Sequence, residues 1–168
     1  MRARDDAEFS EFAATMIRPL RRTAYLMCGD WHRAEDAAQD ALVKVYRRWH
    51  RIERGEGVRS YAHRAVVTSV LDQSRKPWRR ERSEDTDETS MVAPDIGGPV
   101  DDRLLVIKAL AQLAPSQRAC VVLRYYNDLS VEEAANILGI SQGGVKSQTS
   151  RGLDRLRELL GHPERSAL

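Results

Sequence analysis

Apolar side chains recur every three or four positions along most of this chain, which is the spacing of one face of an α-helix. The clearest run follows Gly29, a helix stop, and Asp30, a helix N-cap. Its members are Ala34, Ala37, Ala38, Ala41, Leu42, Val45, Tyr46 and Trp49. The sequence therefore predicts an amphipathic helix that begins after Asp30 and buries an alanine-rich stripe.

The stretch before Gly29 is also periodic, but it contains a proline. Helical spacing joins Phe9, Phe12, Met16, Leu20, Tyr25 and Met27. Because Pro19 cannot donate a backbone hydrogen bond and its ring crowds the preceding turn, we expect two helices that meet near Arg18.

Residues 51–60 contain two glycines and no apolar period, which predicts a loop. Ser60 can cap a following helix from about Tyr61 to Arg75, and Pro77 ends it. The expected apolar positions of this helix are Tyr61, Ala65, Val67, Val70 and Leu71, while its expected polar positions are Arg64, Thr68, Gln73, Arg75 and Lys76.

Helical periodicity returns at Asp102 and predicts two helices, the second of which starts at Pro115. The expected apolar positions are Leu104, Leu105, Ile107, Leu110 and Leu113 in the first, and Ala119, Val121, Val122, Leu123 and Tyr126 in the second. We expect these helices to bury the apolar face of the segment that follows them.

Residues 131–150 predict a helix, a tight turn and a second helix. Ser130 and Glu133 can form a capping box, Gly139 suits a left-handed turn, and Ser141 can cap the second helix. This is the arrangement of a DNA-binding helix-turn-helix. The second helix offers groups suited to base edges and phosphates, namely Gln142, Lys146, Ser147, Ser150, Arg151 and Arg155. The alternative is a helical hairpin whose basic face is only solvated.

Charge divides the chain into three parts. Residues 1–82 carry 18 Lys and Arg against 12 Asp and Glu, residues 83–102 carry none against 7, and residues 103–168 carry 9 against 6. The middle segment mixes acids, Ser, Pro and Gly without apolar periodicity, so it cannot bury a core. Together with 42% hydrophobic residues and few aromatics, this predicts an all-α chain of two small helical domains joined by a flexible acidic linker.

Two further surfaces are candidates for binding. The polar face of the 31–49 helix carries Glu35, Asp36, Gln39, Asp40, Lys44 and an isolated apolar Val43, and it suits either a docked protein or simple complementarity to the helix dipole. Residues 75–82 combine five basic side chains with Trp78, a composition that suits melted nucleic acid or a solvated helix end with one packed tryptophan.

Composition excludes several other classes. Cys28 and Cys120 have no metal-ligand spacing, so we expect two buried or idle thiols and no metal or cofactor. No apolar run approaches the roughly 20 residues that cross a bilayer, and no signal-peptide core is present, so a cytoplasmic protein is expected. A metalloenzyme built on His32, Glu35, Asp36 and Asp40 would need matching ligands on other helices, which the sequence does not offer.

Three sequence blocks together carry a family resemblance: AEDAAQDALVKVYRRW at 34–49, RAVVTSVLDQSRK at 64–76 and GISQGGVKSQTSRGLDRLR at 139–157. With these blocks in this order, almost the whole chain closely resembles bacterial RNA polymerase sigma factors of the extracytoplasmic-function (ECF) class of the sigma-70 family. The resemblance implies a detachable specificity subunit that catalyses nothing itself. It implies core RNA polymerase and promoter DNA as partners, and an anti-sigma factor as a common regulator.

The resemblance also implies domain limits and residue roles. Residues 1–82 would be the region 2-like domain, 83–102 a linker in the polymerase RNA path, and 103–168 the region 4-like domain. Core polymerase would contact Glu35, Asp36, Gln39, Asp40 and Val43. The −10 element, with an unstacked base near the 51–60 loop, would contact Arg64, Thr68, Asp72, Arg75, Lys76, Trp78, Arg79 and Arg80. The −35 element would contact Gln142, Gly143, Gly144, Lys146, Ser147, Ser150 and Arg151.

Two positions depart from the family pattern, which often has Asn where Thr68 stands and Thr where Gly144 stands. A free-standing helix-turn-helix regulator remains the alternative function. It would bind promoter DNA tightly without polymerase, whereas a sigma factor needs the polymerase.

Overall fold

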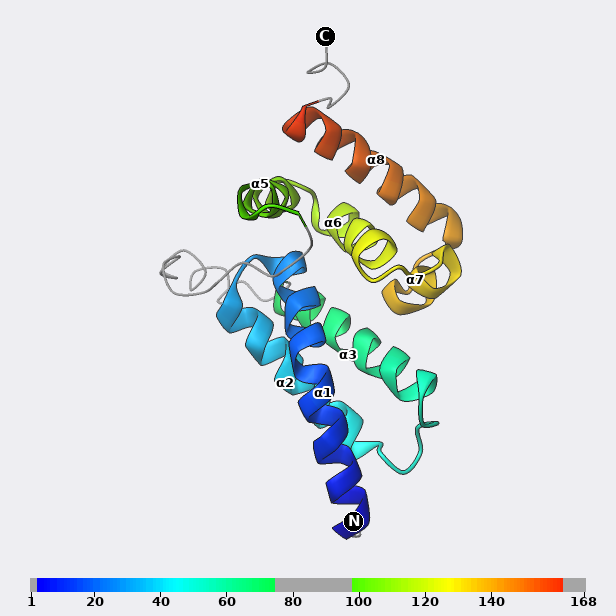
Figure 1. Cartoon of the computed structure of the whole chain (residues 1–168). Helices are drawn as coiled ribbons and strands as arrows, with labels where there is room; N and C mark the ends of the chain where they lie inside the picture. The colour runs from blue at the N-terminus through cyan, green and yellow to red at the C-terminus, as the bar shows by residue number, and fades with distance from the viewer. Residues whose placement is uncertain (1–2, 75–97, 162–168) are drawn as a thin grey trace. The chain divides into compact units, whose positions relative to one another are not determined.

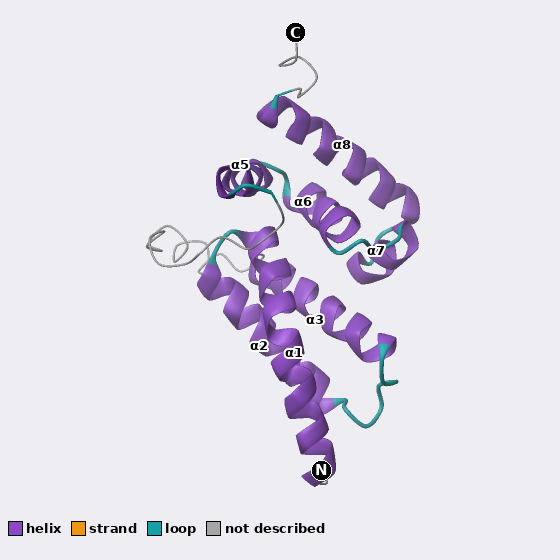
Figure 2. Cartoon of the chain, viewed as in Figure 1, coloured by secondary structure: helices purple, strands orange, loops and turns teal. Residues whose placement is uncertain are grey.

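The computed structural model describes residues 3–74 and 98–161, and every regular element in these ranges is a helix (Figure 1). Figure 2 shows the helices and the short loops that join them. The all-α prediction is therefore confirmed. The chain divides into two compact units, Met1–Ser90 and Met91–Leu168.

In its described residues the first unit consists of α1 (Ala3–Cys28), α2 (Trp31–Arg47) and α3 (Glu56–Ser74), which all pack against one another. The carboxylate of Asp30 caps α2 as predicted, accepting from the N–H groups of His32 and Arg33 at 2.9 and 3.2 Å. Close packing on α2 is possible because its buried stripe is made of small side chains, with no exposed surface on Ala34, Ala37, Ala38 and Ala41. Tyr46, expected in this stripe, lies at its edge and is 39% exposed.

The predicted break near Arg18 is wrong, because α1 continues through Pro19 as one helix. Pro19 cannot donate to the carbonyl of Thr15, but this side of the helix is exposed, so water can bond that carbonyl. On the other side, Met16 and Leu20 are buried and pack both halves of α1 into the core. Packing therefore outweighs the cost of a proline inside a helix, which is about 3 kcal/mol.

The predicted start of α3 is also wrong. The helix begins at Glu56, directly after Gly55 with φ +79°, so Ser60 lies inside α3 and does not cap it. Val58 is only 3% exposed, and its burial extends the packed face of α3 one turn before Tyr61. Gln73, expected on the polar face, is 4% exposed and belongs to the buried side.

The second unit contains α5 (Val100–Ala111), α6 (Pro115–Val121), a π-helical segment (Val122–Tyr126), α7 (Val131–Leu138) and α8 (Gln142–Leu160). α8 packs against α5, α6 and α7. Pro115 is the first residue of α6 and Gly161 ends α8, as predicted. Residues 75–97 lie outside the described ranges, so most of the expected linker does too, and its last residues, Val100–Asp102, begin α5.

The expectation that Leu104 and Leu105 are buried is wrong, since they are 41% and 56% exposed. α5 contributes its second half to the core, through Ile107 and Leu110. A helix that packs at one end leaves the apolar residues of the other end uncovered within its unit.

The helix-turn-helix forms as its local signals indicate. Ser130 and Glu133 make a reciprocal capping box, with the hydroxyl 3.1 Å from the Glu133 N–H and the carboxylate 2.8 Å from the Ser130 N–H. Gly139 ends α7 with φ +67°, and Ser141 caps α8. Val145 is completely buried and anchors the start of α8 in the core of the unit.

Candidate nucleic-acid and protein-binding surfaces

The polar face of α2 is a continuous exposed strip. Asp36, Gln39, Asp40 and Val43 are all exposed, and Gln39 and Asp40 each lie three or four residues from both Asp36 and Val43. Val43 is 48% exposed and adds an apolar side chain to a face of charged and polar residues. The strip therefore offers two carboxylates, one amide and one apolar contact, a combination suited to a protein partner.

Glu35 differs from the other α2 candidates. One carboxylate oxygen lies 3.0 Å from Nη1 of Arg21 in α1, and the other accepts from Nε2 of Gln39 at 3.3 Å. The first turn of α2 holds no acid, so complementarity to the helix dipole does not explain Glu35. Its charge is offset within the unit.

On α3, the structure places Arg64, Thr68 and Asp72 on one exposed face, each one turn from the next. The Thr68 hydroxyl donates to the Arg64 carbonyl at 2.7 Å, so toward a ligand its oxygen remains an acceptor. The other predicted residues of this surface, Arg75, Lys76, Trp78, Arg79 and Arg80, lie outside the described ranges.

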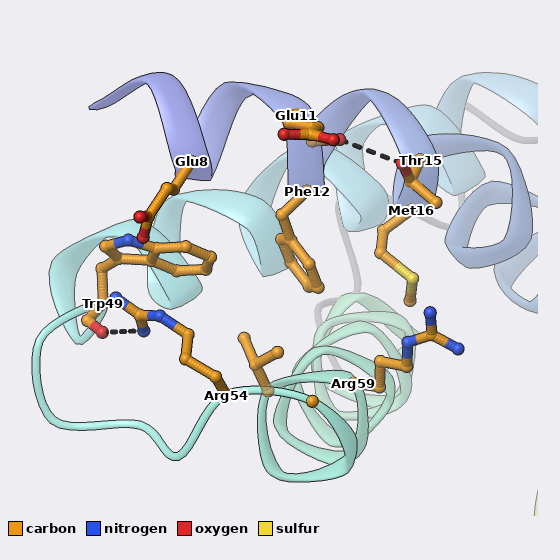
Figure 3. A pocket seen from close by; sticks show the side chains of 10 residues that line it. Glu8, Glu11, Phe12, Thr15, Met16, Trp49, Arg54 and Arg59 are labelled. Carbon is orange, nitrogen blue, oxygen red and sulfur yellow. Dashed lines mark hydrogen bonds between the residues drawn. The ribbon is translucent and has the colours of Figure 1, made fainter. Parts of the chain in front are cut away.

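A pocket of about 320 Å³ lies between α1, the loop after α2 and the start of α3 (Figure 3). Its walls combine acids, bases and aromatic rings from three separate parts of the chain, namely Glu8, Glu11, Phe12, Thr15, Met16, Trp49, Arg54, Gly55, Val58 and Arg59. Sequence spacing did not find this pocket, although it placed Phe9, Phe12 and Trp49 on the apolar faces of predicted helices.

Arg54 controls the shape of this pocket. Its guanidinium lies 3.8 Å from the centre of the Trp49 ring and donates to the carbonyl oxygens of Trp49 and Ile52. Phe9 and Phe12 contact the same ring, with centroids 5.4 and 5.5 Å away. Trp49 is only 3% exposed as a result, and Arg54 holds the loop in its bend.

On α8, the exposed candidates are Gln142, Gly143, Lys146, Ser147, Ser150 and Arg151. They occupy the first half of the helix, and the N–H groups of its first turn favour anions. Gly144 is partly buried, and its N–H already bonds the Ser141 hydroxyl at 2.9 Å. Gly144 therefore serves the cap, while Gln142, Lys146 and Ser147 present their side chains outward.

The remaining reactive groups are structural. Burial raises the pKa of the Cys120 thiol, and a hydrogen bond with Thr149 offsets part of this effect, so the thiol is a weak nucleophile. Cys28 donates to the Asp30 carbonyl at 3.4 Å. Burial lowers the pKa of His63 and the charge of Arg59 lowers it further, which keeps the imidazole neutral. Within 3–74 and 98–161, no three His, Cys, Asp or Glu residues converge on a common point.

Comparison with known families matches both units. The model of Sigma-70 region 2 matches residues 12–80, and the model of Sigma-70 region 4 matches residues 109–158. The first covers the α2 strip, the α3 face and the pocket residues from Phe12 onward, and the second covers the helix-turn-helix.

Relatives that align with most of this chain are also sigma factors. The RNA polymerase sigma-E factor of Streptomyces coelicolor is 36% identical over 156 residues, which cover 91% of this chain and 86% of the relative. The ECF RNA polymerase sigma factor SigM of Mycobacterium tuberculosis is 33% identical, with 95% and 81% covered. Among solved structures, the sigma factor RpoE of Bartonella quintana, in complex with the anti-sigma factor NepR, matches with a TM-score of 0.73 and 29% identity over 91% of this chain and 96% of that one. No helix in the described ranges has the length and apolar character needed to cross a membrane.

Proposed function

This chain belongs to the ECF class of the sigma-70 family, and we propose that it binds core RNA polymerase, directs it to promoters, opens the −10 element and so begins transcription. The observation that carries the proposal is the presence of regions 2 and 4 in order in one chain, each on its own helical unit. The relatives are transcription initiation factors, and we assign the chain no reaction of its own. As a polymerase subunit it would act in the cytoplasm.

We assign polymerase docking to the α2 strip of Asp36, Gln39, Asp40 and Val43. The exposed side chain of Val43 supports this assignment, because its apolar surface contributes to stability only when a partner covers it. The exposed carboxylates of Asp36 and Asp40 beside it would steer a basic partner surface.

The −10 element would lie along Arg64, Thr68 and Asp72 on α3, with an unstacked base in the pocket beside the loop. The pocket offers aromatic surface for stacking, carboxylates that accept from base amino groups, and guanidinium groups for phosphate. Because Arg54 covers the Trp49 ring, a base could stack there only after the Arg54 side chain moves. Capture of an unstacked base makes melting selective, since unstacking costs a few kcal/mol that a fitting base regains.

The −35 element would receive the first half of α8 in its major groove. Gln142, Lys146, Ser147, Ser150 and Arg151 supply the side chains for bases and phosphates. Gly143 and Gly144 add no bulk at the helix start, which allows the backbone to approach the phosphates.

The linker and an anti-sigma partner complete the proposal. Residues 83–102 carry seven acids and no Lys or Arg, which suits the basic RNA path of the polymerase. A neutral linker of equal length would then change initiation, read as abortive transcripts, more than promoter binding. An anti-sigma factor is an expected regulator, because the Bartonella relative was solved with one.

Reconstitution with core polymerase tests the function. With core enzyme, the full chain should direct initiation from a discrete set of genomic sites that share −10 and −35 sequences, read by sequencing transcript starts. Without core enzyme it should bind the same DNA weakly. Tight binding of the free chain to promoter DNA would instead favour a free-standing regulator.

A further inference from the structure

Arg21 connects α1 to the docking strip on α2. Its Nη1 atom lies 3.0 Å from Oε2 of Glu35. Its guanidinium carbon also lies 6.0 Å from the centre of the Trp31 ring, and that ring stacks on Tyr25 at 4.0 Å with an interplanar angle of 13°. The stacked rings form a rigid surface beside the ion pair, so Arg21 has a defined place and is not a freely moving surface charge.

The ion pair continues into the strip. While Oε2 of Glu35 faces Arg21, Oε1 accepts from the amide of Gln39 at 3.3 Å. Gln39 is exposed at the centre of the strip, with Asp36 and Asp40 beside it. A continuous series of contacts therefore runs from α1 through Glu35 to the Gln39 amide.

We propose that Arg21 is a positioning residue for polymerase docking, and that Glu35 acts through Arg21 and Gln39 and does not itself touch the polymerase. This inference rests on the docking role proposed above. Both oxygens of Glu35 already have partners within the unit and Arg21 offsets its charge, so Glu35 attracts a basic partner surface less than Asp36 or Asp40 does. Without Arg21, Glu35 would act as a third negative charge beside Asp36 and Asp40, and the carboxylate that accepts from the Gln39 amide would lose its contact with α1.

The size of the effect follows from exposure. The side chains of Arg21 and Glu35 are 36% and 37% exposed, so solvent screens the pair and its contribution is modest. We therefore expect Arg21→Glu and Glu35→Arg each to lower the affinity of the full chain for core polymerase about three- to five-fold, with little change in Tm.

Exchange of the two charges is the decisive test. The double variant R21E/E35R restores an ion pair, and Gln39 can turn its amide so that the oxygen accepts from the introduced guanidinium. Its affinity should return to within about two-fold of the wild type. If Glu35 contacts the polymerase directly, the double variant will bind as weakly as Glu35→Arg alone, which overturns the proposal.

Two controls separate this inference from the docking role itself. Arg4→Glu makes the same charge change in α1 and breaks an exposed ion pair with Glu8 at 3.3 Å, far along the helix from Arg21, and it should leave the affinity unchanged. An equal loss with Arg4→Glu would show a general charge effect and overturn the proposal. The single substitution Asp36→Lys should by itself weaken binding to core polymerase. If it does while Arg21→Glu and Glu35→Arg do not, only the positioning role fails; if Asp36→Lys has no effect, the docking strip fails.

Discussion

Gly152 in α8 lies so close to α6 that a Cβ atom on it would stand 2.7 Å from Cγ2 of Val121. The same atom would be 3.3 Å from the carbonyl oxygen of Gln117. Gly152 is buried, and its lack of a side chain allows α6 and α8 to meet. α8 is therefore held against α6 by a contact that only glycine permits.

We expect Gly152→Ala to lower the free energy of unfolding by about 1–3 kcal/mol, because the added methyl group forces the helices apart. Gly143→Ala is the matched control, since a Cβ there meets only the Ser141 hydroxyl at 3.9 Å. That change should raise the free energy of unfolding by about 0.5–1 kcal/mol through helix propensity. Urea unfolding of the full chain measures both, and equal effects of the two substitutions would contradict close packing at Gly152.

The sequence predicted this motif well where the signals are local. Ser130, Glu133, Gly139 and Ser141 act within four residues of the backbone groups they bond or the turn they make. Prediction from the sequence failed where tertiary packing determines the local structure. Pro19 is accepted inside α1 because Met16 and Leu20 are buried beside it.

The same division holds for the candidate sites. The exposed strip on α2 followed from helical spacing, since one helix alone sets its geometry. The pocket did not, because Glu8, Trp49 and Val58 come together only when three segments pack. The role of Glu35 was also beyond the sequence, since its partner Arg21 lies on another helix.

Asp128 has a left-handed backbone conformation, with φ 54°, in the turn before α7. Side chains with a Cβ are strained in this conformation, although Asp tolerates it better than most. Asp128→Gly should raise the free energy of unfolding by about 0.5 kcal/mol, and Asp128→Ala should lower it by about 1 kcal/mol. Thermal unfolding of both variants is the check, and a more stable alanine variant would be inconsistent with this strain.

The exposed basic residues at the start of α8 should matter for the −35 element. Lys146→Ala or Arg151→Ala should weaken promoter-directed transcription, and a residue that reads a base should change the preferred sequence by about 1–3 kcal/mol at one position. Arg157→Ala is the control, because it removes the same charge from the same helix but its side chain pairs with Asp154 at 3.0 Å. If Arg157→Ala has the larger effect, the wrong half of α8 has been placed in the groove.

Arg54 should matter for promoter opening more than for promoter binding. Its contacts with the Trp49 ring and with two carbonyl oxygens stabilise the conformation of the loop. Arg54→Ala should therefore disorder the pocket wall. We expect about a five- to ten-fold loss in open complexes, read as permanganate reactivity of −10 thymines, from the loss of a cation–π contact and charge-assisted hydrogen bonds.

Two variants test whether the geometry or the charge of Arg54 is responsible. Arg51→Ala removes one positive charge from an exposed position in the same loop, and it should have a smaller effect on opening. Arg54→Lys keeps the charge, but an ammonium cannot stack flat on Trp49 and donate to two carbonyl groups at once. It should therefore resemble Arg54→Ala. Normal promoter opening by Arg54→Lys, together with a defect in Arg51→Ala as large as that of Arg54→Ala, would contradict this prediction. The loop would then contribute only positive charge, and the contacts of Arg54 with Trp49 would not matter for melting.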